Sequence, residues 1–217
     1  MEVLEYIKED GSNPYKKWFD SLNAQAAAKV TVAKARLELG NSSSIKWFDG
    51  IGEYRIDWGP GYRVYLVKDG KTLIILLGGG TNKRQRNDIK MAIELSKEYK
   101  SRQKQRWTRA ITRDYKDTIN ERVSREPAFT AALLDEAITL FLNGEPEVAR
   151  LVLRDLVNAT VGFEELALEV DKPSKSLHRM LSARGNPTMD NLTKIIGTLR
   201  NNLGLDIEVH TTPTRAA

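Results

Sequence analysis

The sequence predicts an α+β domain in its first half and an all-α domain in its second. Three observations support this prediction. Apolar and polar residues alternate between residues 45 and 68, which is typical of strands. From Pro127 onward, apolar residues recur with the period of an α-helix. Between these stretches, residues 100–106 are charged or polar and show no apolar periodicity, which indicates a boundary.

The domain limits follow from this boundary. We expect a first domain over residues 1–102, a linker over 103–113, a second domain over 114–210 and a disordered tail over 211–217. Residues 1–107 hold 20 Lys and Arg against 13 Asp and Glu, whereas residues 108–217 hold 14 against 16. A basic half suits a polyanionic partner, and an acidic half could cover it electrostatically. Chance variation between two domains is the alternative.

The first half is expected to begin with a strand over residues 3–7, followed by a turn and a helix that starts at Pro14. A second helix is expected over residues 23–39, ending at Gly40. Four strands follow at 45–48, 53–58, 62–68 and 72–77, separated by short glycine-containing turns. Residues 73–77 are apolar throughout, which predicts a central strand covered on both faces.

A helix is expected after the three glycines at 78–80, running to about residue 99. Asn82 is its expected N-cap, with Gln85 as a capping-box partner. The helix start carries a cluster of basic residues, Lys83, Arg84 and Arg86. Free backbone N–H groups at a helix N-terminus already favour an anion, so this junction is a candidate phosphate site. A solvated basic turn is the alternative.

The hairpin from Gly52 to Tyr65 is the most informative stretch. If residues 59–61 form a three-residue turn, Asp57 pairs with Arg63 and Arg55 pairs with Tyr65. Alternation then puts Arg55, Asp57, Arg63 and Tyr65 on one face and an almost wholly apolar set on the other. The polar face could hold a phosphodiester. The alternative is a solvated outer face with an Asp57–Arg63 pair.

Three motifs of the first half carry a resemblance to a known family: ED-G-x-N-P near the start, E-x-R-I-D-x-G-P-G-Y-R-V-Y from Glu53, and L-L-x-G-G followed by Lys83, Gln85 and an Asp-Ile pair. Residues 1 to about 100 resemble a phage-derived, HigB-type toxin of the RelE/ParE superfamily. The resemblance implies a twisted antiparallel sheet with helices on one side and an RNA-binding face on the other. It also implies ribosome-dependent cleavage of mRNA.

The same resemblance implies roles for four residues. Such cleavage proceeds by attack of a ribose 2′-OH on the adjacent phosphate, so the site must bind the phosphate, accept one proton and deliver another. Arg55 and Arg63 would stabilise the pentacoordinate phosphate, with Tyr65 and Lys83 as catalytic candidates for proton transfer. Tyr and Lys ionise near pH 10, so this chemistry would need strongly shifted pKa values or help from the ribosome.

The second half is expected to begin with helices at Pro127 and Pro146, because proline favours the first helical position. A helix-turn-helix follows, whose second helix runs from Ser174 to about Ala183. Leu177, Met180 and Leu181 would pack inward. The outward residues that could reach bases or phosphates are Ser174, Lys175, Ser176, His178, Arg179 and Ser182. A helical bundle with a solvated polar face is the alternative, and residues 205–209 are expected to add a strand.

Residues 112–210 resemble HigA-type antitoxins with a Cro-like helix-turn-helix domain. The motifs are LLDEAITLFLNGEPEVARLVLRDLVNATVGFEELA and KPSKSLHRMLSARGNPTMDNL. The resemblance implies a protein that neutralises its toxin and represses its own operon as a dimer, and we expect a homodimer. The expected partners are therefore mRNA on the ribosome, operator DNA, and the two halves themselves, within one chain or between chains.

We therefore interpret the chain as a toxin and its antitoxin fused in one polypeptide. Tethering raises the local concentration of the inhibitor to roughly millimolar, which would keep the nuclease silent. The alternative is a DNA-binding transcriptional regulator whose toxin-like domain is catalytically inactive. A ParE-like gyrase inhibitor is a third possibility, which the RNA-suited face disfavours.

Composition sets outer limits on function. The chain has 217 residues, no cysteine and a hydrophobic content of 41%. No apolar run approaches the roughly 20 residues of a membrane span, and the opening residues do not resemble a signal peptide. We expect a cytoplasmic protein without a membrane association. No His, Cys or acidic pattern suggests a metal site, so we expect no cofactor and metal-independent chemistry.

Overall fold

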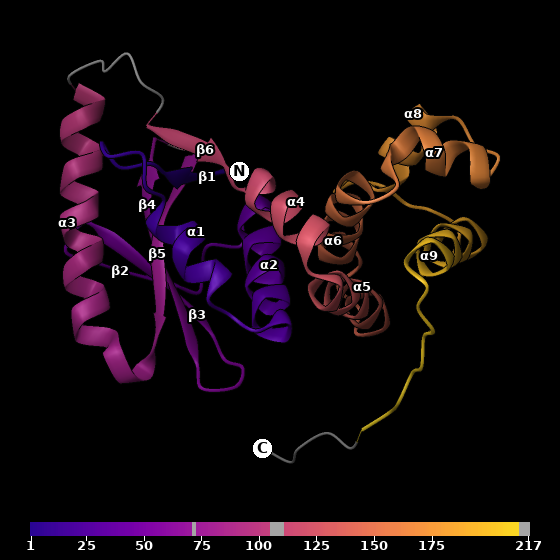
Figure 1. Cartoon of the computed structure of the whole chain (residues 1–217), viewed down its shortest axis with the longest axis horizontal. Helices are drawn as coiled ribbons and strands as arrows, with labels where there is room; N and C mark the ends of the chain where they lie inside the picture. Colours follow the sequence, from indigo (N-terminus) through magenta and orange to yellow (C-terminus); the bar gives the residue numbers. More distant parts are fainter. Residues whose placement is uncertain (71–72, 105–110, 213–217) are drawn as a thin grey trace.

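A computed structural model describes residues 1–70, 73–104 and 111–212 of the chain. The fold is mixed: a mainly antiparallel sheet with helices on both faces comes first, and mostly helices follow (Figure 1). Residues 103 and 104, expected in the linker, are the last two of helix α3 (Gln85–Lys104). Residues 112 and 113 lie in strand β6 (Thr112–Asp114), and residues 105–110 lie outside the described part.

The sheet contains six strands in the order β2-β3-β4-β5-β1-β6. Besides β6, they are β1 (Glu2–Tyr6), β2 (Ile45–Phe48), β3 (Ile51–Ile56), β4 (Tyr62–Asp69) and β5 (Leu73–Thr81). Neighbouring strands are antiparallel except β1 and β5, which run parallel. The expected antiparallel sheet is therefore correct apart from one pair. The described side chains of the central strand β5 from Ile74 to Leu77 are buried, as expected.

Helices cover both faces of this sheet. Helices α1 (Pro14–Asp20) and α2 (Ala24–Glu38) lie on one face, and α3 lies on the other (Figure 1). The expectation of helices on a single side is therefore wrong. Helix α3 covers the second face because its apolar residues Ala92, Leu95 and Tyr99 form a second core with strand residues. Those strand residues include Tyr65, Val67, Ile75 and Leu77.

The register of the β3–β4 hairpin differs from the expected one. Arg55 lies opposite Arg63, and Ile56 opposite Tyr62, so residues 57–61 form the connection. Gly59 and Gly61 both have positive φ, +58° and +75°. The Gly61 amide bonds to the carbonyl of Trp58, which draws Trp58 into the turn and out of the ladder. The expected pairs of Arg63 with Asp57 and of Tyr65 with Arg55 are therefore wrong.

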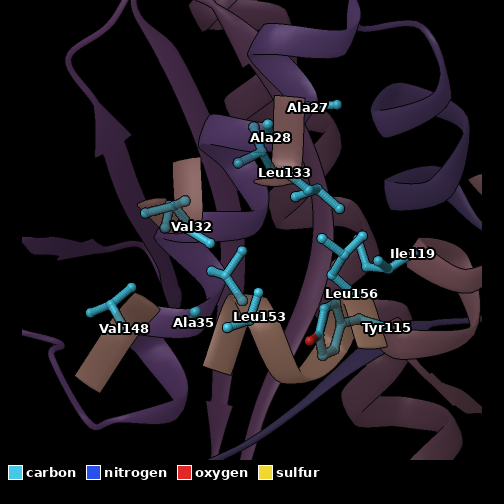
Figure 2. Packing of buried hydrophobic residues seen from close by; sticks show 14 of the residues in the cluster. Ala27, Ala28, Val32, Ala35, Tyr115, Ile119, Leu133, Val148, Leu153 and Leu156 are labelled. Carbon is cyan, nitrogen blue, oxygen red and sulfur yellow. The ribbon is translucent and has the colours of Figure 1, made fainter. Parts of the chain in front are cut away.

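The C-terminal helices pack against α2. They begin with α4 (Tyr115–Arg125), α5 (Pro127–Leu142) and α6 (Pro146–Ala159), and the two prolines occupy the expected first positions. Figure 2 shows alanines and Val32 of α2 facing apolar residues of these three helices. Ten consecutive α2 residues, 26–35, are buried apart from Lys29. A helix buried nearly all round lies inside a core, so α2 joins both halves.

Polar contacts reinforce this packing. The buried guanidinium of Arg122 in α4 donates hydrogen bonds to the carbonyl oxygens of Phe19 and, at 2.6 Å, Leu22. Lys29 of α2 lies 2.7 Å from Glu136 of α5, and Arg36 lies 2.8 Å from Glu145. Each contact joins residues about a hundred positions apart in the chain.

Three helices complete the fold: α7 (Gly162–Glu169), α8 (Ser174–Met180) and α9 (Met189–Leu203). Residues 170–173 connect α7 to α8. Helix α9 ends at Gly204, whose φ of +62° is left-handed. Residues 205–209 have no regular secondary structure, so the expected terminal strand is wrong. Thr211 and Thr212 have no regular structure, and residues 213–217 lie outside the described part.

Candidate functional site

Four polar side chains share the face of the sheet on which α3 lies. In the hairpin, Arg55 pairs with Arg63 and Glu53 pairs with Tyr65, so all four alternate onto that face. Tyr65 belongs to the core formed with α3, whereas Tyr54, Val64 and Leu66 belong to the core on the α1–α2 side. The structure therefore brings together Arg55, Arg63 and Tyr65, as the alternation predicts. Asp57, which the alternation also predicted on this face, instead lies exposed in the turn.

Glu53 is the centre of this group, although the sequence analysis gave it no role. Its side chain is only 2% exposed. One carboxylate oxygen lies 3.3 Å from Nε of Arg55, and the other lies 3.4 Å from Nε of Arg63. The second oxygen also accepts hydrogen bonds from the Tyr65 hydroxyl at 3.4 Å and from Gln85 at 3.0 Å. Its position two residues before Arg55 is the signal that could have found it.

The two arginines differ in accessibility. The Arg63 side chain is 9% exposed, and its guanidinium donates a hydrogen bond to the Asn82 side chain besides facing Glu53. The Arg55 side chain is 55% exposed. Arg63 is therefore held in place by its neighbours, and Arg55 is the arginine open to an incoming anion. We call Glu53, Arg55, Arg63, Tyr65, Asn82 and Gln85 the Glu53 cluster.

Asn82 and Gln85 do not form the expected capping box. Asn82 lies in a 3-10 turn, η1 (Asn82–Arg84), and α3 starts only at Gln85. The Asn82 amide group donates to the carbonyl oxygen of Pro60 at 3.1 Å, while its oxygen accepts from Arg63. Gln85 donates to Glu53 instead of reaching back to Asn82. Both amides therefore connect the helix start to the hairpin, and the cap prediction is wrong.

The candidates for proton transfer lie in different surroundings. Burial, and next the nearby Glu53 carboxylate, raise the pKa of the Tyr65 hydroxyl far above its usual range. Tyr65 therefore stays neutral at physiological pH and acts as a hydrogen-bond donor. Lys83 is exposed in η1, next to Asn82 in the chain. Glu53, with a carboxylate beside Arg55 and Arg63, is the group of the cluster that can accept a proton.

The second predicted site lies on α8. Lys175 and Arg179 are exposed, while Ser174 and Ser176 are half-buried. The Ser174 hydroxyl donates to Glu164 of α7 at 2.7 Å. Leu177 and Leu181 are buried and Met180 is packed against the same core, as predicted.

The remaining two residues of this site are engaged locally. The His178 ring stacks on Phe163 of α7, with 3.7 Å between the ring centroids. Ser182 follows the end of α8, and its hydroxyl donates to the carbonyl oxygen of Arg179 at 2.8 Å. The Ser182 carbonyl oxygen accepts from Arg150 of α6 at 3.0 Å. Lys175 and Arg179 are thus the charged groups of α8 that remain open to a partner.

The C-terminal helices lie away from the Glu53 cluster. Helices α5 and α6 pack on α2, which lies on the face of the sheet opposite α3 (Figure 1). The cluster lies on the α3 face. Within one chain, the described helices of the second half therefore do not cover the phosphate site. The contact surface between the halves is centred on the alanine-rich α2.

The described residues give two further negative findings. No three His, Cys, Asp or Glu side chains in this part of the chain come together so that they could hold a metal ion. Within the same residues, no helix is both long enough and apolar enough to cross a membrane.

Comparison with known proteins finds a relative of this chain in Haemophilus influenzae. Over 86 residues, the chain is 45% identical to an uncharacterized protein of Haemophilus influenzae. The match covers 39% of this chain and 87% of the relative. No family model and no solved structure matches the chain. By this similarity, the chain belongs to the same family as the Haemophilus influenzae protein.

Proposed function

We propose that this chain is a fused toxin–antitoxin protein whose first half is a ribosome-dependent mRNA endonuclease of the HigB type. The observation that carries the proposal is the Glu53 cluster. A carboxylate, two arginines and a neutral tyrosine lie on one face of the sheet, and the two arginines and the tyrosine each contact the Glu53 carboxylate. These are the groups that cleavage at a ribose 2′-OH needs.

In this proposal each group has one task. Arg55 binds the scissile phosphate from solvent, and Arg63 is pre-positioned to stabilise charge on the pentacoordinate phosphorus. Glu53 accepts the proton of the 2′-OH as the 2′-oxygen attacks phosphorus. The bond to the 5′-oxygen breaks, which leaves a 2′,3′-cyclic phosphate on one product. In this proposal the exposed Lys83 protonates the departing 5′-oxygen.

The second half supports a role in DNA binding. Helices α7 and α8, with a four-residue connection between them, fit a helix-turn-helix. Helix α8 would enter the major groove, where Lys175 and Arg179 can contact phosphates or base edges. A homodimer would bind a two-fold operator and repress the operon.

The proposed inhibition follows from where the helices lie. Because α4–α6 pack on α2, they leave the Glu53 cluster open to small molecules. They do add bulk to the face of the sheet opposite the cluster. We therefore propose that the second half blocks entry into the ribosome and leaves the cluster itself unoccupied.

The endonuclease is tested by mapping mRNA cleavage on translating ribosomes. The proteins compared are the full chain, residues 1–104, and residues 1–104 with Arg55→Ala. We expect cleavage by the fragment alone, and growth arrest when it is expressed in bacteria. Because the fragment exposes α2, circular dichroism must first show that it is folded. A folded fragment that leaves mRNA intact would overturn the proposal.

A DNA-binding regulator with an inactive toxin-like domain remains the second candidate. One observation favours it: Arg63 is neutralised by Glu53 and bonded to Asn82, which leaves Arg55 as the open arginine of the cluster. This candidate predicts operator binding by the full chain and no cleavage by the fragment. The two measurements therefore separate the candidates.

A further inference from the structure

A cavity of about 620 Å³ lies where strand β5 passes between α1 and α3. Trp18 of α1, Gly79 of β5 and Asp88 and Met91 of α3 are among its lining residues. Tyr65 of the Glu53 cluster also lines it, so the cavity and the cluster share this residue. We call it the Trp18 cavity.

The sheet creates this cavity by an unequal pairing. Strand β1 pairs with β5 along residues 73–76, whereas β5 continues to Thr81. Leu66 pairs with Leu76 but Tyr65 pairs with Gly78, so β5 has a bulge at Leu77. Bulges redirect the side chains that follow them and are frequent beside active sites.

The glycines after the bulge let two side chains lie directly on the strand. A Cβ atom at Gly79 would lie 2.4 Å from the indole of Trp18. A Cβ atom at Gly80 would lie 2.0 Å from the Asp88 carboxylate. Both distances are far inside van der Waals contact, so no other residue type fits without displacing these groups. The glycine run is therefore a packing requirement of the cavity wall.

The lining chemistry suits a nucleobase. An indole offers a flat surface for stacking, which contributes about 1–3 kcal/mol per base in single-stranded nucleic acid complexes. Lys17 and Arg84, both exposed, line the same cavity and favour an anionic chain. The buried Oδ2 of Asp88 has no hydrogen-bond partner within the described residues, so its carboxylate can accept from a base N–H group.

We propose that the Trp18 cavity binds the base of the nucleotide adjacent to the scissile phosphate, a reading that rests on the RNA-cleaving function proposed above. The base lies against Trp18, with an N–H group at Asp88, while its phosphate reaches Arg55 and Arg63. An extended peptide could instead pair with the free edge of β5. The cations Lys17 and Arg84, and the Tyr65 side chain shared with the Glu53 cluster, favour RNA.

The test uses the full chain labelled with 5-fluorotryptophan, observed by ¹⁹F NMR. Substitution of each tryptophan by phenylalanine assigns its resonance. The probe is a single-stranded RNA tetranucleotide with 2′-O-methyl riboses, which cannot be cleaved, and the control is the same oligomer without bases. We expect a saturable shift of the Trp18 resonance with RNA and none with the abasic oligomer. The resonance of Trp47, which is 47% exposed on β2, should stay in place.

Variants sharpen the test. Trp18→Leu should weaken RNA affinity about tenfold, the loss of one stacked base, and leave abasic-oligomer affinity unchanged. Because Trp18 also packs against the core, Met91→Glu is a second variant. Met91 is 58% exposed, so the added charge should weaken RNA binding without disturbing the fold.

Four outcomes are decisive. A Trp18 shift with RNA supports the cavity, even if the ribosome assay shows no cleavage and the endonuclease proposal fails. If RNA binds through Arg55 and the Trp18 resonance does not shift, the cavity proposal is overturned and the endonuclease proposal stands. Absence of RNA binding also overturns the cavity proposal. A shift caused by an acidic heptapeptide and not by RNA would assign the cavity to strand addition, and so also overturn the proposal.

Discussion

The carboxylate of Glu53 lies 3.4 Å from Nε of Arg63, on the face of the sheet that α3 covers. Both side chains are almost entirely withdrawn from solvent, at 2% and 9% exposure. Removing one member of such a pair leaves the other charge buried and uncompensated, which is strongly destabilising. The pair is therefore a structural unit as well as the core of the proposed site.

Glu53→Gln should lower stability, because Arg63 loses its counter-charge, and in the protein that remains folded it should separate catalysis from binding. The amide keeps the size of the side chain and can still accept from Tyr65, but it cannot take a proton from a 2′-OH. We expect ribosome-dependent cleavage by the folded N-terminal fragment to fall by about 10²- to 10⁴-fold, the usual contribution of a general base. RNA affinity should not fall, because a negative charge beside the phosphate is removed. Single-turnover cleavage and equilibrium binding measure the two quantities.

Arg55→Ala serves as the matched control for that prediction. Arg55 contacts the same carboxylate but is exposed, so its loss should reduce both RNA affinity and cleavage. Equal effects of Glu53→Gln and Arg55→Ala on affinity would contradict a proton-accepting role for Glu53.

Arg63 should contribute more than Arg55 to the free energy of unfolding. Arg63→Ala leaves buried Glu53 without its main counter-charge, so we expect a loss of about 3 kcal/mol in the free energy of unfolding. Arg55→Ala removes an exposed group, so we expect a change below about 0.5 kcal/mol. Urea denaturation of the full chain measures both. Similar losses for both variants would show that Arg63 is not the buried partner of Glu53.

The polar face of the hairpin could be predicted even though its register could not. The observed pairing of Arg55 with Arg63 is shifted by two residues from the expected one, and a shift of two preserves which side chains share a face. The choice between the registers depends on positive φ angles at Gly59 and Gly61 and on the Trp58 turn. Alternation carries no information on these.

The missed parts of the fold have two different origins. Helix α4 does have a local signal, since Tyr115, Ile119 and Val123 recur every four residues. The packing of the halves has no local signal. It depends on contacts between distant residues, such as Arg122 with the Phe19 carbonyl, and on α2 being covered on both sides. Periodicity in the sequence identifies one buried face of a helix, but it does not show which elements cover the other face.

DNA binding should depend on the open cations of α8. We expect Lys175→Ala and Arg179→Ala each to weaken binding to the upstream DNA of the chain's own gene by about tenfold, since a good base or phosphate contact contributes about 1–3 kcal/mol. Lys116→Ala, on exposed α4 surface, makes the same charge change elsewhere and should have little effect. Fluorescence anisotropy at fixed salt measures all three. Equal weakening by Lys116→Ala would indicate a general charge effect and argue against groove docking by α8.

Glu5 should make the stability of the chain depend on pH. Burial raises the pKa of its carboxyl from 4.5 to about 7, although Asn13 and Thr118 donate hydrogen bonds to it. A raised carboxyl pKa means that the folded state holds the proton more tightly than the unfolded state. The contribution of Glu5 to stability is therefore complete below about pH 4.5 and is lost as the pH rises to about 7.

Glu5→Gln mimics the protonated form and removes this dependence. At pH 8 the variant should be more stable than the parent chain by up to about 3 kcal/mol, and the difference should shrink toward pH 5. Urea denaturation of both proteins at each pH gives the difference, which cancels the titration of other groups. A constant difference across this range would show that Glu5 does not titrate there.

The burial of α2 predicts that the two halves unfold together. Leu153 of α6 is fully buried in the core shared with α2 (Figure 2), so Leu153→Ala should cost about 2–5 kcal/mol. Because the core is shared, hydrogen exchange should accelerate in β4 and β5 as well as in α5 and α6. Leu142→Ala is the matched control, since Leu142 of α5 is 62% exposed and should tolerate the same change. Faster exchange confined to the C-terminal helices would mean that the halves are separate cooperative units, joined only by the chain.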